Sequence, residues 1–201
     1  MSFANMSLKE FNNKLSSSSP TPGGGSVAGL SAALSASLLS MVISLTEDSE
    51  LNEYMEKLKE NIEFALELID KDALSFNEVM EAFKMSRQTE QEIQKRKEAI
   101  QTALYNASLT PLETIKVAKS ILEITEDVAQ KGNKNAISDV GVAALMAISS
   151  IKGAAYNVYI NTASFKDKNK TEKLNKKTKN LVRESQIIAD RIEDLCLNKI
   201  L

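Results

Sequence analysis

Histidine and tryptophan are absent from this chain, and cysteine occurs once, at Cys196. Without histidine there can be no Ser-His-Asp or Cys-His catalytic site and no histidine-ligated metal, and one thiol cannot complete a cysteine-rich zinc site. Acid–base chemistry must therefore come from aspartate, glutamate, lysine or tyrosine. Cys196 lies between two leucines in a helical pattern, so we interpret it as a small buried hydrophobe.

Net charge is also nearly absent, because 25 basic residues balance 27 acidic ones to give −2. Such a chain would neither steer DNA nor hold an anionic membrane, so we expect no nucleic-acid or membrane partner. The start lacks the basic cluster and apolar core of a secretory signal, and we expect a cytoplasmic protein. Residues 26–45 carry no charge over about the length of a bilayer span, but their serine and alanine content favours a buried core helix.

Strand alternation and hairpin motifs are missing as well, whereas helix signals recur along the chain. Capping boxes predict three helix starts, at Ser7 with Glu10, Thr89 with Glu92, and Thr110 with Glu113. Pro111 would then occupy a first helical position, and Gly132 would end that helix.

Apolar periodicity completes the prediction of the fold. Steps of three and four predict one long amphipathic helix over residues 51–83, a helix buried on several sides over 138–165, and a C-terminal helix entered through a charged, solvated stretch at 166–179. At 201 residues, the chain suits a single domain spanning residues 1–201. We therefore predict an all-α, up-and-down helical bundle.

The loop from Pro20 to Ser26 is the first candidate binding element. Three glycines ahead of a helix expose backbone N–H groups that attract anions or carbonyl oxygens. The spacing is neither a Rossmann fingerprint nor a phosphate loop, and a plain helix-entry turn would need only one glycine. The candidate binding residues are Pro22, Gly23, Gly24, Gly25 and Ser26.

Asp72 is the candidate catalytic carboxylate. It lies three residues after Ile69 and four before Phe76, at the edge of the apolar seam, whereas Asp70 points elsewhere. A carboxylate against a core is costly unless paired, and burial raises its pKa toward the range useful for proton transfer. Position alone leaves an ion-paired structural aspartate as an equal alternative.

Three cations follow the long helix. Arg96 lies between Ile93 and Ile100 on the expected inward face, where it could pair with a core acid or grip an acidic substrate. Lys84 and Arg87 could contribute, although surface solvation is the commoner role of such residues.

The run from Gly132 to Ala144 and the helix after it carry the remaining polar candidates. Asn and Asp favour turns, so a simple connector is one interpretation. Ser150, Asn157 and Asn161 continue down an otherwise apolar face, where they either bond between helices or recognise a flat polar ligand. The candidates are Asn133, Asn135, Ser138, Asp139, Asn157 and Asn161.

Four motifs occur in an order that resembles the cyclodeaminase domain of formiminotransferase-cyclodeaminase and its free-standing bacterial relatives, some of which are methenyltetrahydrofolate cyclohydrolases. They are PTPGGGSVAG from Pro20, IDKDALSFNEVMEAF around Asp72, LTPLETI around Pro111, and GNKNAISDVGVAA from Gly132 with NVYIN from Asn157. The resemblance extends to about Asp167. Where relatives often have LPK, this chain has Met85, Ser86 and Arg87, which retains the charge and loses the proline.

The resemblance implies a homodimeric enzyme of reduced-folate chemistry with Asp72 as the catalytic residue and no cofactor. Under this hypothesis the glycine loop and the asparagine cluster hold the pterin and one-carbon end, with Asp139 as a second catalytic carboxylate. Lys84, Arg87 and Arg96 then hold the glutamate tail of a folate that can be polyglutamylated. The residues alone do not choose between formimidoyltetrahydrofolate cyclodeaminase and methenyltetrahydrofolate cyclohydrolase. The resemblance slightly favours the cyclodeaminase, which is the defining activity of that domain, and an inactive helical scaffold is a third alternative.

Overall fold

A computed structural model describes residues 2–47 and 49–201, and these residues form helices and no strand. This confirms the all-α prediction. The elements are α1 (Leu8–Leu15), α2 (Gly24–Ser44), η1 (Ser49–Glu53), α3 (Tyr54–Lys84), α4 (Glu90–Lys131), η2 (Lys134–Ala136), α5 (Ile137–Ala163) and α6 (Lys168–Ile200).

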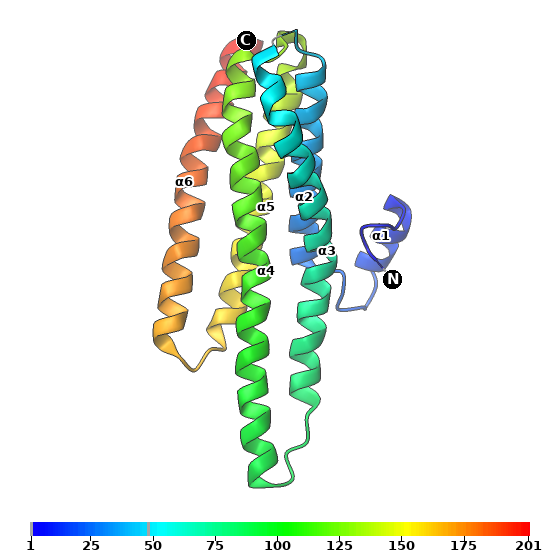
Figure 1. Ribbon diagram of the computed structural model, residues 1–201, viewed down its shortest axis with the longest axis vertical. Coiled ribbons are helices and arrows are strands. Elements are labelled where there is room, and N and C mark those ends of the chain that lie inside the picture. The colour runs from blue at the N-terminus through cyan, green and yellow to red at the C-terminus, as the bar shows by residue number, and fades with distance from the viewer. Residues whose placement is uncertain (1, 48) are drawn as a thin grey trace.

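Helices α2, α3, α4 and α5 form an elongated four-helix bundle, and α6 packs along α4 and α5 (Figure 1). The short α1 stands off the side of the bundle beside α3 (Figure 1). Up-and-down packing of this kind follows from long amphipathic helices joined by short connections.

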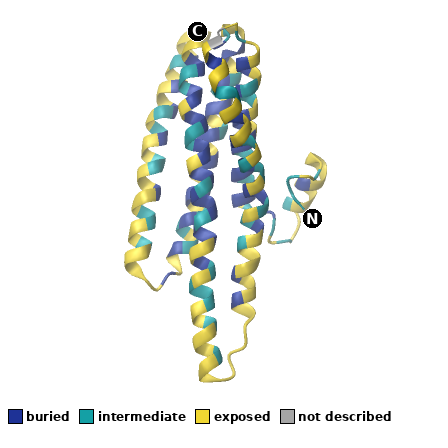
Figure 2. Ribbon diagram, in the orientation of Figure 1, coloured by how far each residue is buried: buried dark blue, intermediate teal, exposed yellow. Residues whose placement is uncertain are grey.

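The centre of the bundle is built on small residues, and the ribbon segments coloured as buried in Figure 2 lie where the helices face one another. Ala32 and Ala36 on α2, and Ala143 and Ala147 on α5, are fully buried. Small side chains let the two backbones approach closely enough for serines to cross-link them, as Ser35 Oγ does by donating to the Ala143 carbonyl at 2.7 Å.

The apolar segments Gly24–Ser44 and Lys134–Ala163 are long and apolar enough to cross a membrane by length and composition alone. In the structure, 56% and 50% of their most apolar windows are buried inside the bundle. The predicted core-helix role of residues 26–45 is thus confirmed.

Two of the three predicted capping boxes are present, and the third is wrong. Ser7 and Thr89 each accept from the amide three residues later while the glutamate there accepts from the cap. At Thr110 and Pro111, however, α4 continues without interruption from Glu90 to Lys131. Gly132 follows the last residue of α4, as predicted.

Helix α4 tolerates Pro111 because a side chain replaces the lost backbone hydrogen bond. Proline has no N–H, so the carbonyl four residues earlier, that of Ala107, loses its helical donor. The side-chain amide of Asn161 on α5 donates to that carbonyl at 2.9 Å. Pro111 therefore lies inside α4 and does not start a helix, and the hydrogen bond from Asn161 to the Ala107 carbonyl links α5 to α4.

The α3–α4 end of the bundle extends beyond α5 and α6 (Figure 1). The apolar face predicted for residues 51–83 is therefore buried over only part of its length. Leu58, Ala65 and Ile69 are buried as predicted. The last three members, Phe76, Met80 and Phe83, are exposed, because α4 is the one described helix that runs beside that end of α3 (Figures 1 and 2).

At the C-terminal end, most of the charged stretch 166–179 is helical, since α6 begins at Lys168 with Asp167 as its cap. Cys196 is buried in the α5–α6 contact, where burial raises the pKa of its thiol. The interpretation of Cys196 as a small buried hydrophobe is confirmed.

Candidate functional site

A cavity of about 300 Å³ lies where the start of α2, the middle of α3 and the end of α5 meet. Its wall combines backbone, two side-chain amides, hydroxyls and apolar groups around one carboxyl group, that of Asp72. The lining residues are Pro20, Thr21, Gly23, Gly24, Gly25, Asp72, Ser75, Phe76, Val79, Ala107, Asn157, Ile160 and Asn161.

The glycine loop forms one wall of this cavity, after a cis peptide bond between Thr21 and Pro22. Gly23 caps α2 in an extended conformation, and Gly24 and Gly25 are its first two residues. The first N–H groups of a helix have no intrahelical acceptor and give that end a partial positive charge. The start of α2 can therefore attract electron-rich groups of a ligand.

Gly25 is required by the close approach of Asp72. A Cβ atom at position 25 would lie 2.0 Å from Asp72 Oδ1 and 2.4 Å from its Cγ, far inside van der Waals contact. The backbone of α2 thus packs directly against the carboxyl group, and any larger residue at position 25 would displace that group or the start of α2.

The Asp72 carboxyl group is half-buried and has an uncharged environment. Among the residues that the structure describes, no lysine or arginine lies within ion-pairing distance of it, so the ion-paired alternative is not supported. Burial raises the pKa of Asp72, and hydrogen bonds from Ser26 offset part of that effect. The carboxyl group therefore keeps a proton to higher pH than an exposed aspartate does.

The Ser26 hydroxyl makes the protonated state of Asp72 easy to accommodate. Ser26 Oγ lies 3.1 Å from Asp72 Oδ2 and 3.0 Å from the Ile69 carbonyl oxygen, and it is fully buried. One hydroxyl proton cannot serve both acceptors at once. When Asp72 is protonated, its O–H can donate to Ser26 while Ser26 donates to Ile69, and every partner is satisfied.

Sequence reasoning missed five lining residues outside the Pro20–Ser26 loop, three of which share the Asp72 face of α3. Ser75, Phe76 and Val79 follow Asp72 by three, four and seven residues, the spacing that places side chains on one helical face. Ser75 Oγ also lies 3.2 Å from Thr110 Oγ1 on α4. Helical spacing from Asp72 would have located all three. Ile160 lies between the two predicted asparagines on α5, whereas Ala107 comes from α4 and no sequence feature marked it.

Asn157 and Asn161 lie in the cavity wall, as the sequence hypothesis requires. Asn157 Nδ2 donates to the Gly153 carbonyl in its own helix at 2.9 Å, and Asn161 Nδ2 donates to the Ala107 carbonyl of α4. Ser150 instead donates to the Ala28 carbonyl of α2 at 2.7 Å, deep in the core. The three polar residues of this face therefore have different local roles.

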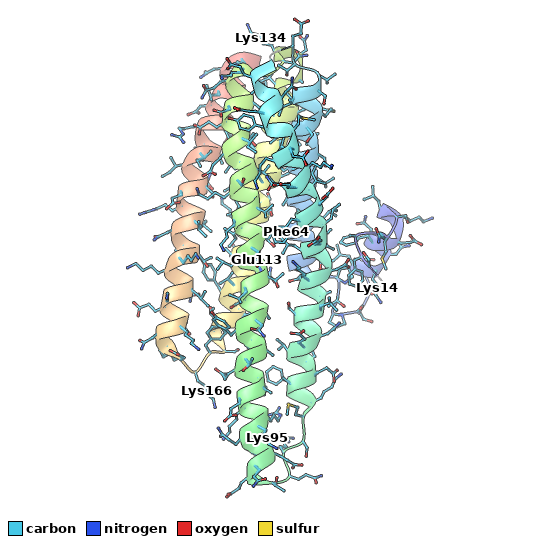
Figure 3. All side chains as sticks on the ribbon, viewed as in Figure 1. Lys14, Phe64, Lys95, Glu113, Lys134 and Lys166 are labelled. Atoms are coloured by element: carbon cyan, nitrogen blue, oxygen red, sulfur yellow. The ribbon has the colours of Figure 1, made fainter. Side chains whose placement is uncertain are left out.

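The remaining asparagine cluster lies at the other end of the bundle. Figure 3 labels Lys134 at one end and Lys95 at the opposite, α3–α4 end. Asn133 caps η2 by accepting from the Asn135 amide and donates to the Leu45 carbonyl at 2.7 Å, so it joins the end of α2 to the start of α5.

Helix length separates this cluster from the cavity. Ser138 and Asp139 open α5, and 18 residues lie from Asp139 to Asn157, or roughly 27 Å along a helix. A single chain does not bring Asn133, Asn135, Ser138 or Asp139 to Asp72, and Ser138 lines a second groove, between α5 and α6.

The three cations lie at or beyond the end of α3. Lys84 is 12 residues, or roughly 18 Å, after Asp72 and pairs with Glu81 at 2.8 Å. Arg87 lies in the connection between α3 and α4, and Arg96 donates from Nε and Nη2 to the Phe83 carbonyl at 3.2 and 2.9 Å. None of the three lines the cavity.

Within residues 2–47 and 49–201, no group of three or more cysteine, aspartate or glutamate side chains is arranged to hold a metal ion.

Residues 7–180 match the family described as Formiminotransferase-cyclodeaminase. The chain is 34% identical to methenyltetrahydrofolate cyclohydrolase of Methylorubrum extorquens over 98% of both chains. It is 32% identical to mouse formimidoyltransferase-cyclodeaminase over 92% of its own length, but it spans only 36% of that protein. The solved structure of formiminotetrahydrofolate cyclodeaminase from Thermotoga maritima superposes with a TM-score of 0.82 at 27% identity, covering 98% of each chain. The chain therefore belongs to the formiminotransferase-cyclodeaminase family of folate-processing enzymes.

Proposed function

We propose that this protein is a methenyltetrahydrofolate cyclohydrolase, with Asp72 as the group that moves protons in the cavity. The observation that carries the proposal is a half-buried carboxyl group of raised pKa, with no cation beside it in the described chain, at the wall of a cavity of about 300 Å³. The relative that matches this chain from end to end at 34% identity bears that name, which supports the choice of reaction.

The proposed reaction hydrolyses the one-carbon bridge of 5,10-methenyltetrahydrofolate. Water attacks the methenyl carbon, the bond from that carbon to N5 breaks, and 10-formyltetrahydrofolate forms. One proton of the water is transferred to N5 and the other is released to solvent. Asp72 accepts the proton from the attacking water and returns it to N5, a role that positioned acid–base groups perform with a typical gain of ~10²–10⁴-fold.

Formimidoyltetrahydrofolate cyclodeaminase is the second candidate, and the full-length similarity to the solved cyclodeaminase structure favours it. In that reaction N10 attacks the formimino carbon of 5-formiminotetrahydrofolate, the bond to the terminal nitrogen breaks, and protonation of that nitrogen releases ammonia. Both reactions need a proton delivered to a departing nitrogen, so the same carboxyl group serves either.

Rates with the two substrates decide between these functions. Falling methenyl absorbance faster than the uncatalysed background supports the cyclohydrolase, whereas rising absorbance with ammonia release supports the cyclodeaminase. A folded protein that binds no reduced folate and changes the absorbance in neither direction would instead be a helical scaffold.

The role of Asp72 has its own test. An Asp72→Asn variant should lose ~10²–10⁴-fold in kcat. Glu78→Gln, an exposed carboxylate six residues later on α3, is the matched control and should keep wild-type turnover. An Asp72→Asn variant that turns over at the wild-type rate while folded contradicts the assignment.

We also assign the glutamate tail of the folate to the α3–α4 end of the bundle. That end projects past the cavity and carries Lys84, Arg87 and Arg96 (Figure 1). Replacing Arg87 with glutamine should raise KM more for a polyglutamylated substrate than for the monoglutamate, because each added carboxylate extends the same charge attraction. If the Arg87 substitution raises KM for neither substrate, or raises it equally for both, this assignment is contradicted.

A second copy of the chain is the proposed partner, seated on the outward face of α2 and α5. That apolar face includes Leu34, Met41, Val142 and Leu145, which are all exposed. α2 contains no charged residue, and α5 contains only Asp139 and Lys152. An uncharged apolar surface of this extent on two long helices is typical of a self-interface.

The positions of the two charges favour an antiparallel, two-fold arrangement. In an isologous interface, residue i meets residue j on both sides of the axis. An axis near Leu145 would set Lys152 against the partner's Asp139 twice, and would bring the partner's helix start toward Tyr156, which is exposed beside the cavity residue Asn157.

Light scattering tests the interface. Leu145→Glu should give a monomer, whereas Leu74→Glu, at a similarly exposed leucine on α3, should not change the mass. Asp139→Lys should weaken the dimer, and adding Lys152→Asp should restore it. A wild-type protein that is monomeric throughout the assay concentrations overturns the proposal.

A further inference from the structure

The N-terminal arm, residues 2–23, is attached to α3 by one aspartate. Asp70 Oδ1 accepts from the Phe3 backbone N–H at 2.6 Å, and Asp70 Oδ2 accepts from the Ser2 hydroxyl at 2.6 Å. Hydrogen bonds to an ionised carboxylate are short and stronger than neutral ones. The two bonds therefore form a specific polar clamp between the start of the arm and the middle of α3.

Asp70 and Asp72 hold the two ends of the same segment. Asp70 binds Phe3, and Asp72 binds Ser26, so residues 4–25 begin and end on a single turn of α3. Two residues on a helix are about 3 Å apart along the axis and roughly 200° apart around it. The two carboxyl groups consequently face different sides of α3 and have different partners.

The segment between these two attachments has few buried residues, which are Phe11, Pro22 and Gly25. α1 stands off the side of the bundle (Figure 1), and its one buried residue is Phe11. An isolated helix of eight residues is not stable in water. The polar clamp at Asp70 thus limits how far the arm can move from α3.

The end of this segment is a wall of the candidate active site. Pro20, Thr21 and Gly23 line the cavity and precede the first turn of α2. Ser19 Oγ donates to the Thr21 carbonyl at 2.7 Å, which gives the wall a local shape but no bond to α3. Its position against Asp72 therefore depends on the attachments at the two ends as well as on the packing of the buried Pro22.

We propose that Asp70 is a positioning residue, which sets the Pro20–Gly25 wall against the cavity by clamping Ser2 and Phe3. The inference deepens the proposed folate function and rests on it for its kinetic consequence. Loss of the clamp leaves the Asp72 carboxyl group and its Ser26 partner in place, so it weakens substrate binding and spares the chemical step.

Steady-state kinetics of Asp70→Ala provide the first test. KM for the folate should rise about tenfold, the equivalent of about 1.4 kcal/mol, while kcat stays near the wild-type value. Asp70→Asn retains one carbonyl acceptor and should fall between the two. Glu67→Ala, an exposed residue one turn earlier that pairs with Lys71, is the matched control and should leave both constants unchanged.

Variants in the arm separate the clamp from any effect on α3 itself. Phe3→Pro removes the N–H donor of one of the two bonds without touching α3, and it should raise KM less than Asp70→Ala does, because the Ser2 bond remains. Combining it with Asp70→Ala should add little further, because Asp70→Ala already breaks the Phe3 bond. Additive effects of the two substitutions would overturn the proposal.

Hydrogen exchange tests the same inference without any substrate. Amides of residues 17–25 should exchange faster in Asp70→Ala and Phe3→Pro, with those of α5 unchanged, because the wall has lost an attachment. Unchanged exchange in residues 17–25 refutes the positioning role even if the enzyme is active. Faster exchange in a protein that turns over neither folate substrate would uphold the clamp and sink only the proposed function.

Discussion

Replacing Gly25 with alanine tests the geometry of the candidate site most directly. The new Cβ would lie 2.0 Å from Asp72 Oδ1, and ordinary contact begins at 3.4 Å, so the carboxyl group or the start of α2 must move by about 1.4 Å. Such a shift breaks the 3.1 Å bond between Ser26 and Asp72. A misplacement of about 1 Å in a catalytic group can cost ~10²-fold in rate.

The same substitution has a small net effect on stability. Alanine is better than glycine within a helix by ~1 kcal/mol, while the clash costs about 1–3 kcal/mol. We therefore expect the free energy of unfolding to fall by no more than about 2 kcal/mol. The variant should remain folded and lose activity, which separates catalytic geometry from folding.

Thermal unfolding and turnover measured together provide the assay. Gly153→Ala is the control, because its Cβ would meet Ala28 Cβ at an ordinary 3.8 Å and the residue does not line the cavity. Asp72→Ala removes the atoms that clash, so the Gly25→Ala/Asp72→Ala double variant should recover stability without recovering activity. A folded Gly25→Ala enzyme with wild-type kcat would refute the argument that the carboxyl position controls the rate.

Three further predictions concern the bonds that shape the site. Asn161→Ala should destabilise the fold by ~1–3 kcal/mol by leaving the buried Ala107 carbonyl without a donor, and Pro111→Ala should rescue it in denaturant titrations by restoring a backbone N–H. Burial raises the folded-state pKa of Asp72 above its ordinary value of 3.8, so its contribution to stability is complete below pH 3.8 and is lost as pH rises through the raised pKa; Asp72→Asn should abolish that decline in stability measured against pH. Thr89→Ala should cost ~1 kcal/mol in unfolding free energy by removing the cap of α4, with kcat unchanged because that end lies beyond the cavity.

The fold could be predicted from the sequence because its determinants are local. Caps such as Ser7 and Thr89 act within one turn, and apolar periodicity requires no knowledge of partners. The error at Thr110 has a different origin. A capping box followed by proline favours a helix start when the carbonyl four residues before the proline has no other hydrogen-bond donor. Here that carbonyl belongs to Ala107, and Asn161, 50 positions after Pro111, donates to it.

The candidate site was only partly predictable, because a shared helix face does not imply a shared site. The sequence groups Asp139 and Asn157 in one polar cluster, yet α5 has 27 residues and is about 40 Å long, so the two residues lie near its opposite ends. Within one chain only the end that carries Asn157 reaches Asp72. Asp139 and Asn157 can contact the same folate only if they come from two chains across an interface. An antiparallel dimer is the arrangement that would bring them into one site. Loss of turnover on Asp139→Ala in a protein that stays dimeric would support that arrangement, whereas full turnover would confine the site to the residues around Asp72.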